Sequence, residues 1–107
     1  GVRAARLANI QADLAHDPAL TVDEIARRQG VTPRYVQILF EASGTTFGEF
    51  ATARKLDTAR AMLRSPRYAT WSIAGIAFEA GFRDLSHFNR HFRRRFGTTP
   101  SDYRRSP

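Results

Sequence analysis

Two short stretches of the chain place basic, carboxamide and hydroxyl side chains three, four and seven residues apart. The two sets are Arg34, Gln37, Ile38 and Glu41, and Ser86, Asn89, Arg90 and Arg93. In a helix this spacing brings each set onto one face. A guanidinium can donate two hydrogen bonds to a guanine edge, and a carboxamide can pair with an adenine edge. The sets therefore have the chemistry to read bases, and the plainer interpretation is a solvated helix face.

Positive charge is concentrated near the C-terminus. The 107 residues include 17 lysines and arginines against 10 aspartates and glutamates, a net charge of +7, and all the cations except Lys55 are arginine. Residues 82–107 carry seven arginines against Asp84 and Asp102, a net charge of +5. This favours a polyanionic partner, nucleic acid ahead of a membrane surface. The alternative is that the arginines reflect genome composition and solubility.

Several other classes of protein are disfavoured. The chain has no cysteine, which removes disulfide frameworks and thiol nucleophiles. No Ser/His/Asp set, carboxylate pair or phosphate loop is apparent, so we expect no enzyme and no catalytic residue. His87 and His91 have a spacing that can hold a metal, but Phe88 stands where a zincin has glutamate and no third ligand is near. We expect no metal and no other cofactor.

The chain has no segment that predicts membrane insertion or export. Its longest stretch without a charged residue runs from Tyr68 to Phe78, which is too short to span a bilayer. The N-terminus lacks the apolar region of a signal peptide. We therefore expect a cytoplasmic protein.

Capping signals divide the chain into about seven helices. The first is expected over residues 3–17, and the others follow caps at Thr21, Thr32, Thr46, Ser72, Asp84 and Thr99. Thr21 and Thr46 each precede a glutamate by three residues, the spacing of a capping box. The longest helix is expected over residues 47–65, and no window alternates like a strand. The predicted class is all-α.

Apolar stripes indicate which helix faces are buried. Val36, Leu39 and Phe40 form one stripe, and Phe88, Phe92 and Phe96 form another. Each stripe lies opposite one of the two polar sets, which leaves those sets free. Trp71 precedes a cap and is expected in the core as a hydrophobic staple on Ile76.

The sequence contains an internal repeat. Thr21, Val22, Ile25, Ala26 and Gly30 recur 51 residues later as Ser72, Ile73, Ile76, Ala77 and Gly81. Thr32, Val36, Gln37 and Phe40 recur 52 residues later as Asp84, Phe88, Asn89 and Phe92, and Gly44-Thr45-Thr46 recurs 53 later as Gly97-Thr98-Thr99. Each repeat is a short helix, a glycine turn and a second helix, which predicts a helix-turn-helix motif. The expected division is residues 1–45, a linker helix over 46–66, and residues 67–107.

A more specific pattern follows the same residues. It comprises Ile76-Ala77-Phe78-Glu79-Ala80-Gly81-Phe82, Ser86-His87-Phe88, Phe92, Phe96-Gly97, Pro100 and Tyr103-Arg104. The first half agrees through Ile25-Ala26, Gly30, Leu39-Phe40, Gly44 and Arg54-Lys55-Leu56 with Ala59. Over about residues 20–105 the chain resembles the AraC/XylS family of bacterial transcription regulators.

The resemblance implies a function and partners. It implies two homeodomain-like helix-turn-helix subdomains, joined by a rigid helix, that insert two recognition helices into successive major grooves of double-stranded DNA. Such a domain is usually the C-terminal part of a longer protein with an N-terminal effector or dimerisation domain, so this chain is expected to be a fragment or a stand-alone member. A nucleoid-associated activator that contacts RNA polymerase, and no membrane, is the corresponding expectation.

Helix geometry and the resemblance assign base contacts to the same residues. The expected base contacts are Arg34, Gln37, Ile38, Ser86, Asn89 and Arg90. The expected phosphate contacts are the helix starts at Thr21, Thr46 and Ser72, with His87, Arg93, Arg94 and Arg104. Ile38 departs from the polar or arginine reader that family members often carry. It either contacts a thymine methyl group or leaves the first motif reading few bases.

Two further expectations concern binding geometry and the alternative function. A 19-residue helix would be about 28 Å long, so the two reading helices are expected roughly 34 Å apart, one DNA turn. One chain would then cover an asymmetric site without a partner. The alternative function is a basic amphipathic module, on the strength of residues 89–96, that binds a membrane surface or a protein.

Overall fold

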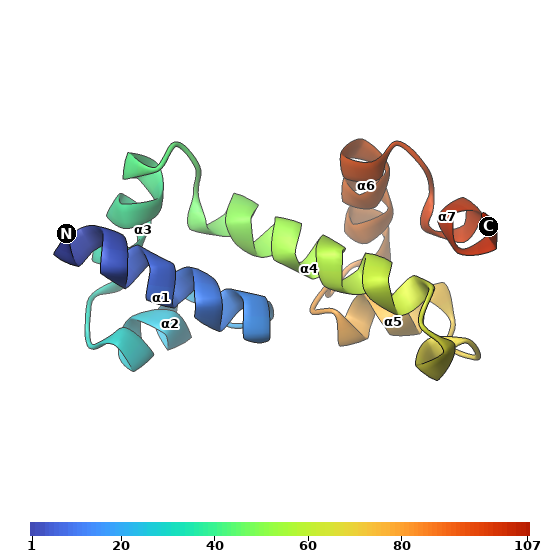
Figure 1. The fold of residues 1–107 in the computed structure, drawn as a ribbon, viewed down its shortest axis with the longest axis horizontal. Helices are drawn as coiled ribbons and strands as arrows, with labels where there is room; N and C mark the ends of the chain where they lie inside the picture. Colours follow the sequence, from blue (N-terminus) through green and yellow to red (C-terminus); the bar gives the residue numbers. More distant parts are fainter. The chain divides into compact units, whose positions relative to one another are not determined.

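The protein is entirely helical in a computed structural model that describes residues 1–107 (Figure 1). Its seven α-helices are α1 (Val2–His16), α2 (Val22–Gln29), α3 (Pro33–Ala42), α4 (Phe47–Leu63), α5 (Ile73–Glu79), α6 (Leu85–Phe96) and α7 (Pro100–Arg105). The predicted all-α class and the seven helices are confirmed. The sequence did not predict the short 3-10 helix η1 (Pro66–Tyr68) that follows α4.

Side-chain caps explain where most helices begin. The predicted caps Thr21, Thr32, Thr46, Ser72, Asp84 and Thr99 each accept a hydrogen bond from the backbone N–H three residues on, at 2.9–3.1 Å. At Thr21 the box is complete, because the Glu24 carboxylate accepts from the Thr21 N–H at 3.0 Å. This bond is the main reason why the pKa of Glu24 lies below its usual value. The second predicted box is only half formed, since Glu49 accepts instead from the Thr45 hydroxyl at 3.0 Å.

The chain forms two compact units that divide within α4. Unit 1 is Gly1–Arg54 and unit 2 is Lys55–Pro107. The first turns of α4 contribute Ala51 to the core of unit 1, and the later turns contribute Leu56 and Ala59 to the core of unit 2. The helix predicted as a separate linker over residues 46–66 is therefore also a packing element of both units. Its action as a linker stays a prediction.

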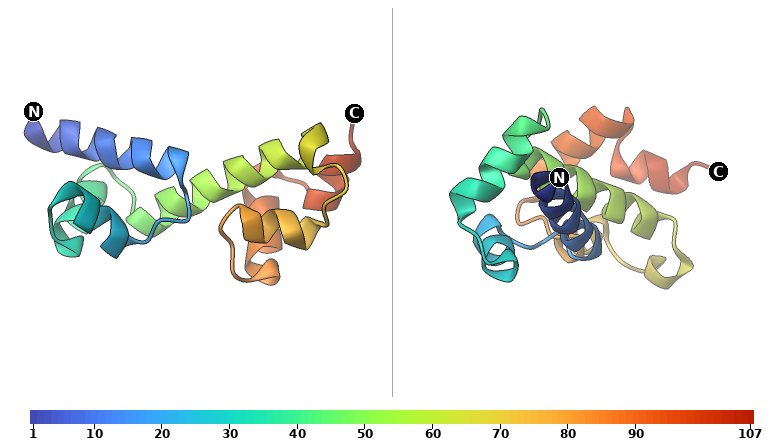
Figure 2. Two further views of the ribbon diagram at one scale, coloured as in Figure 1. Left: turned by 90° about the horizontal axis from the view of Figure 1, so that it is seen from below. Right: turned by 60° about the vertical axis from the view of Figure 1, so that its left-hand side comes forward.

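Unit 1 is built on α1, α2 and α3, with α1 in contact with both of the others (Figure 2). Its buried core comprises Ile10, Leu14, Leu20, Ile25, Ala26, Val36, Leu39, Phe40 and Ala51. The predicted stripe Val36, Leu39 and Phe40 is buried here to 3% exposure or less. Because that stripe is used by the core, the opposite face of α3 points to solvent.

Unit 2 is built on α5, α6 and α7 against the later turns of α4. Its buried core comprises Leu56, Ala59, Met62, Leu63, Ile76, Ala77, Ala80, Phe82, Phe88 and Phe92. Phe88 and Phe92 have no exposed surface, and the Phe92 ring packs on Phe96 at a centroid distance of 4.7 Å. The predicted phenylalanine stripe of α6 therefore faces the core.

The turn inside each motif is closed by the same pattern of backbone hydrogen bonds. Gly30 and Gly81 have φ angles of 67° and 111°, which L side chains rarely adopt. In both turns the residue after the glycine donates its N–H to an alanine carbonyl of the preceding helix. The two bonds are Val31 to Ala26 and Phe82 to Ala77, both 3.0 Å. The sequence repeat is thus also a repeat of backbone hydrogen bonds.

Trp71 is not in the core, contrary to the prediction from its position before a cap. Its side chain is exposed, with 39% relative exposure, and it contacts the edge of Tyr68 at 5.0 Å between ring centroids. A Cβ added at Gly75 would lie 3.7 Å from the indole ring. The ring therefore rests over the bare backbone of Gly75 at the surface, where it does not act as a staple on Ile76.

Candidate nucleic-acid interface

The free face of α6 carries the predicted readers of the second motif. Ser86, Asn89 and Arg90 are all exposed, while Phe88 and Phe92 on the other side of the helix are fully buried. Asp84 fixes the start of the helix by accepting the His87 N–H at 3.1 Å. The structure therefore presents the three readers together on one rigid element.

A shallow cleft of about 810 Å³ runs between this face and the start of α7. Its lining residues are Ser86, Asn89, Arg90, Arg93, Arg94, Thr99, Pro100 and Ser101. The cleft brings three predicted base readers together with Arg93 and Arg94, two of the predicted phosphate contacts. Two exposed guanidinium groups beside carboxamide and hydroxyl groups suit a backbone phosphate that runs past base edges.

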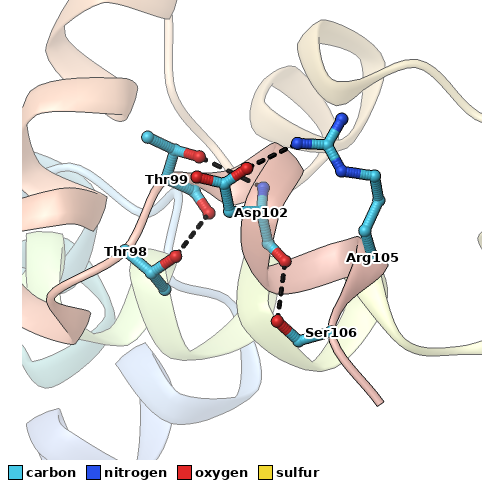
Figure 3. Close-up of polar contacts among 5 residues, drawn as sticks. All are labelled: Thr98, Thr99, Asp102, Arg105 and Ser106. Carbon is cyan, nitrogen blue, oxygen red and sulfur yellow. Dashed lines mark hydrogen bonds and ion pairs between the residues drawn. The ribbon is translucent and has the colours of Figure 1, made fainter.

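Helix α7 supplies the wall of this cleft that sequence reasoning did not assign. Thr99 caps the helix by accepting the Asp102 N–H at 3.1 Å (Figure 3). Asp102 also pairs with Arg105, and the Ser106 hydroxyl donates to the Asp102 carbonyl at 2.9 Å (Figure 3). These bonds lie within α7 and its caps, so they fix where the helix begins and ends. The internal repeat could have indicated this wall, because it aligns Thr99 with Thr46.

The three consecutive arginines of α6 have different surroundings. Arg93 and Arg94 line the cleft, whereas Arg95 donates to both carboxylate oxygens of Asp57 on α4, at 3.0 and 3.3 Å. The sequence prediction that these side chains cannot all face one groove is in agreement with this arrangement. Arg95 thus ties α6 to α4 within unit 2.

The free face of α3 carries the predicted readers of the first motif. Arg34 and Gln37 are exposed, and Ile38 is half-buried. The Arg34 guanidinium lies 3.8 Å from the Glu41 carboxylate, two helical turns along the same face. The first motif therefore presents one ion pair, one carboxamide and part of one aliphatic side chain.

A smaller cleft of about 290 Å³ lies between the end of α3 and the start of α4. Its lining residues are Val22, Gln37, Glu41, Thr46, Phe47 and Gly48. It contains the helix start at Thr46, one of the predicted phosphate contacts. The hydroxyls of Thr21, Thr46 and Ser72 already accept backbone N–H groups, so a phosphate there would meet the remaining amides of the first turns.

Arg104 has partners inside unit 2. Its guanidinium donates to the carbonyl oxygens of Tyr68 and Trp71, both at 2.7 Å, and of Ala69 at 3.3 Å. These bonds anchor α7 to the 3-10 turn after α4. The sequence predicted only a phosphate contact for Arg104. A guanidinium has five N–H donors, so the phosphate contact stays a prediction for the donors that remain.

His87 and His91 lie one turn apart with their ring centroids 4.1 Å from each other. Burial lowers the pKa of His91 below its usual value, and positive charge at His87, Arg94 and Arg90 adds to the effect. These surroundings favour the neutral form of His91. No group of three or more His, Cys, Asp or Glu side chains comes together in the structure. His87 remains a predicted phosphate contact.

Each of the two units contains a capped helix, a glycine turn and a second helix with one free face. This arrangement defines a helix-turn-helix protein. A family model described as a helix-turn-helix domain matches residues 25–106. The chain therefore belongs to this helix-turn-helix family, and its resemblance to AraC/XylS regulators is confirmed.

Named relatives agree with this assignment. The transcriptional activator RhrA of Rhizobium meliloti (strain 1021) is 41% identical over 81% of this chain and 27% of its own length. The regulatory protein SoxS of Salmonella typhimurium is 36% identical over 82% of this chain and 80% of its own length. This chain thus spans about a quarter of the length of the first relative and most of the second.

The fold matches solved structures as well. The DNA-binding transcriptional dual regulator from Escherichia coli K-12 superposes with a TM-score of 0.80 at 20% identity, over 92% of this chain and 94% of that one. The C-terminal domain of the response regulator AraT from Geobacillus stearothermophilus gives a TM-score of 0.71 at 22% identity, over 99% of this chain and 85% of that one. None of the helices of this chain is long and apolar enough to cross a membrane.

Proposed function

We propose that this chain is the sequence-specific double-stranded DNA-binding part of a bacterial transcription regulator. The observation that carries the proposal is the cleft of unit 2, where Asn89 and Arg90 stand on the free face of a rigid helix beside Arg93 and Arg94. In such a site the carboxamide and one guanidinium read base edges while the other cations hold the backbone. No catalytic chemistry is part of the proposal.

Each predicted residue has a role in this proposal that its side-chain chemistry supports. Helices α3 and α6 each enter a major groove of the same duplex. Arg34, Gln37, Ile38, Ser86, Asn89 and Arg90 meet base edges. His87, Arg93, Arg94 and Arg104, with the first turns after Thr21, Thr46 and Ser72, meet phosphates.

The wider setting of this domain is drawn from its relatives. RhrA is named as a transcriptional activator, and the part of it that matches this chain is 27% of its length. We propose that this domain likewise serves activation, works beside an effector or dimerisation domain, contacts RNA polymerase, and acts in the cytoplasm on the nucleoid. The reading of α6 as a membrane-surface helix is disfavoured, because its apolar residues Phe88 and Phe92 are fully buried in unit 2.

We expect Arg90→Ala and Arg94→Ala to differ in what they lose. Loss of the Arg90 guanidinium removes contacts to one base, so affinity for a duplex selected from a random pool falls by about 1–3 kcal/mol and the preference at one base pair relaxes. Arg94→Ala removes a phosphate contact and weakens selected and random duplexes by similar factors. Fluorescence anisotropy on both duplexes measures the two losses. Equal losses on both duplexes for both variants would show that Arg90 is no reader.

A further inference from the structure

The two clefts are equivalent positions of the internal repeat but carry opposite charge. Thr46, Phe47 and Gly48 of the first cleft correspond to Thr99, Pro100 and Ser101 of the second, at an offset of 53. Gln37 corresponds to Asn89 at an offset of 52. At that same offset Glu41 corresponds to Arg93. Where unit 2 presents a guanidinium to the cleft, unit 1 presents a carboxylate.

Glu41 also changes the charge of the whole free face of α3. Its side chain is 58% exposed, and the Arg34 side chain 3.8 Å from it is 70% exposed. These two are the only charged residues of α3, so the helix has no net charge. Helix α6 has four arginines and no acid. A polyanion that approaches both helices therefore meets attraction at α6, and at α3 a carboxylate beside the one cation.

We propose that Glu41 is a specificity-determining residue that acts by repulsion, an inference that rests on the proposed DNA binding. The carboxylate repels backbone phosphate at the first cleft and holds Arg34 in an ion pair. Arg34 then gains most by leaving Glu41 where a guanine edge offers two hydrogen bonds in return. Unit 2 supplies affinity for any duplex, and unit 1 adds to it only where the bases match. Repulsion of the wrong partner is a general route to specificity.

The inference predicts tighter and less selective binding when the charge of Glu41 is removed. For a random-sequence duplex at fixed salt, Glu41→Gln should bind about fivefold more tightly, the effect of one unscreened charge at contact distance in water. A duplex selected for tight binding to the original chain should gain less affinity. The ratio of the affinity for the selected duplex to that for the random duplex therefore falls. Glu41→Arg should add a phosphate contact and steepen the slope of log affinity against log salt by about one.

Glu79→Gln is the matched control. It makes the same change in net charge, from an exposed glutamate on α5 that lines neither cleft. Its gain on the random duplex should stay below about twofold, because its distance from the phosphates leaves the interaction screened. Circular dichroism of each variant checks that the helices are retained.

The outcomes separate this inference from the proposed function. Binding by the original chain, with Glu41→Gln unchanged or no better than Glu79→Gln, overturns the inference and leaves DNA binding intact. A loss of affinity on the selected duplex in Glu41→Gln also overturns it, since Glu41 would then accept a hydrogen bond from a cytosine amino group. Absence of binding by the original chain to any duplex overturns both.

Discussion

DNA binding is expected to weaken about a thousandfold when the salt concentration rises from about 50 to about 200 mM. On α6 and just before it, Arg83, Arg90, Arg93 and Arg94 are exposed and have no carboxylate or carbonyl partner. With the exposed cations of unit 1 they would neutralise about six phosphates, which gives a slope of log affinity against log salt near −5. Released counterions are the physical cause, so the slope counts the phosphate contacts.

Fluorescence anisotropy over a series of potassium chloride concentrations measures this slope. Arg93→Gln and Arg94→Gln should each reduce its magnitude by about one. Arg95→Gln is the neighbouring control and should leave it almost unchanged, because Arg95 is engaged by Asp57 at 3.0 Å. A slope indistinguishable from zero contradicts DNA binding through these arginines.

Phe88→Ala is expected to destabilise unit 2 by about 3–5 kcal/mol, the usual cost of deleting a buried phenyl ring. Phe88 has no exposed surface and packs on Phe82 and Phe92 at centroid distances of 5.1 and 5.6 Å. The loss is a large share of the 5–15 kcal/mol that typically stabilises a whole domain. Unit 2 should therefore unfold at much lower urea concentration and lose its DNA affinity with its fold.

The single tryptophan makes this prediction measurable, because Trp71 lies in unit 2 and reports that unit alone. Urea unfolding followed by tryptophan fluorescence should show the large shift for Phe88→Ala. Phe78→Ala is the matched control, since that ring is 53% exposed on α5, and exposed substitutions usually change stability by about 0.5 kcal/mol or less. Similar midpoints for the two variants would contradict the assignment of Phe88 to the core.

The helices and their caps could be predicted because their signals are local. A cap and its partner are three residues apart, as at Asp84 and His87, and the stripe of Phe88 and Phe92 has the helical period. The same property explains why the polar face of α6 was predicted correctly as free. Because the apolar stripe of an amphipathic helix packs on the core, the opposite side of the helix faces solvent.

The contacts that escaped prediction have no signal in the local sequence. Arg104 was assigned to phosphate from its charge, yet it donates to the carbonyl of Tyr68, 36 residues away. Trp71 has the correct spacing for a staple, but the 3-10 turn beside it places Tyr68 against its ring. Neither the turn nor the partner has a pattern in the local sequence.

The candidate site was partly predictable for the same reason. The side chains of α6 were assigned from one helix, whereas the cleft also needs Thr99 and Ser101 from α7. The prediction that both motifs carry base readers followed from the repeat. The ion pair of Arg34 with Glu41 at 3.8 Å distinguishes the two motifs, and it became meaningful only when the two clefts could be compared.

The proposed function requires this chain to distinguish one duplex sequence from another. The most direct measurement is the ratio of its affinities for a duplex selected from a random pool and for a random-sequence duplex of equal length, at one salt concentration. Specific binding by two reading helices predicts a ratio of about a thousand or more. A ratio near one, with anionic vesicles competing as well as DNA, would contradict sequence-specific binding and show that the basic face binds polyanions without reading bases.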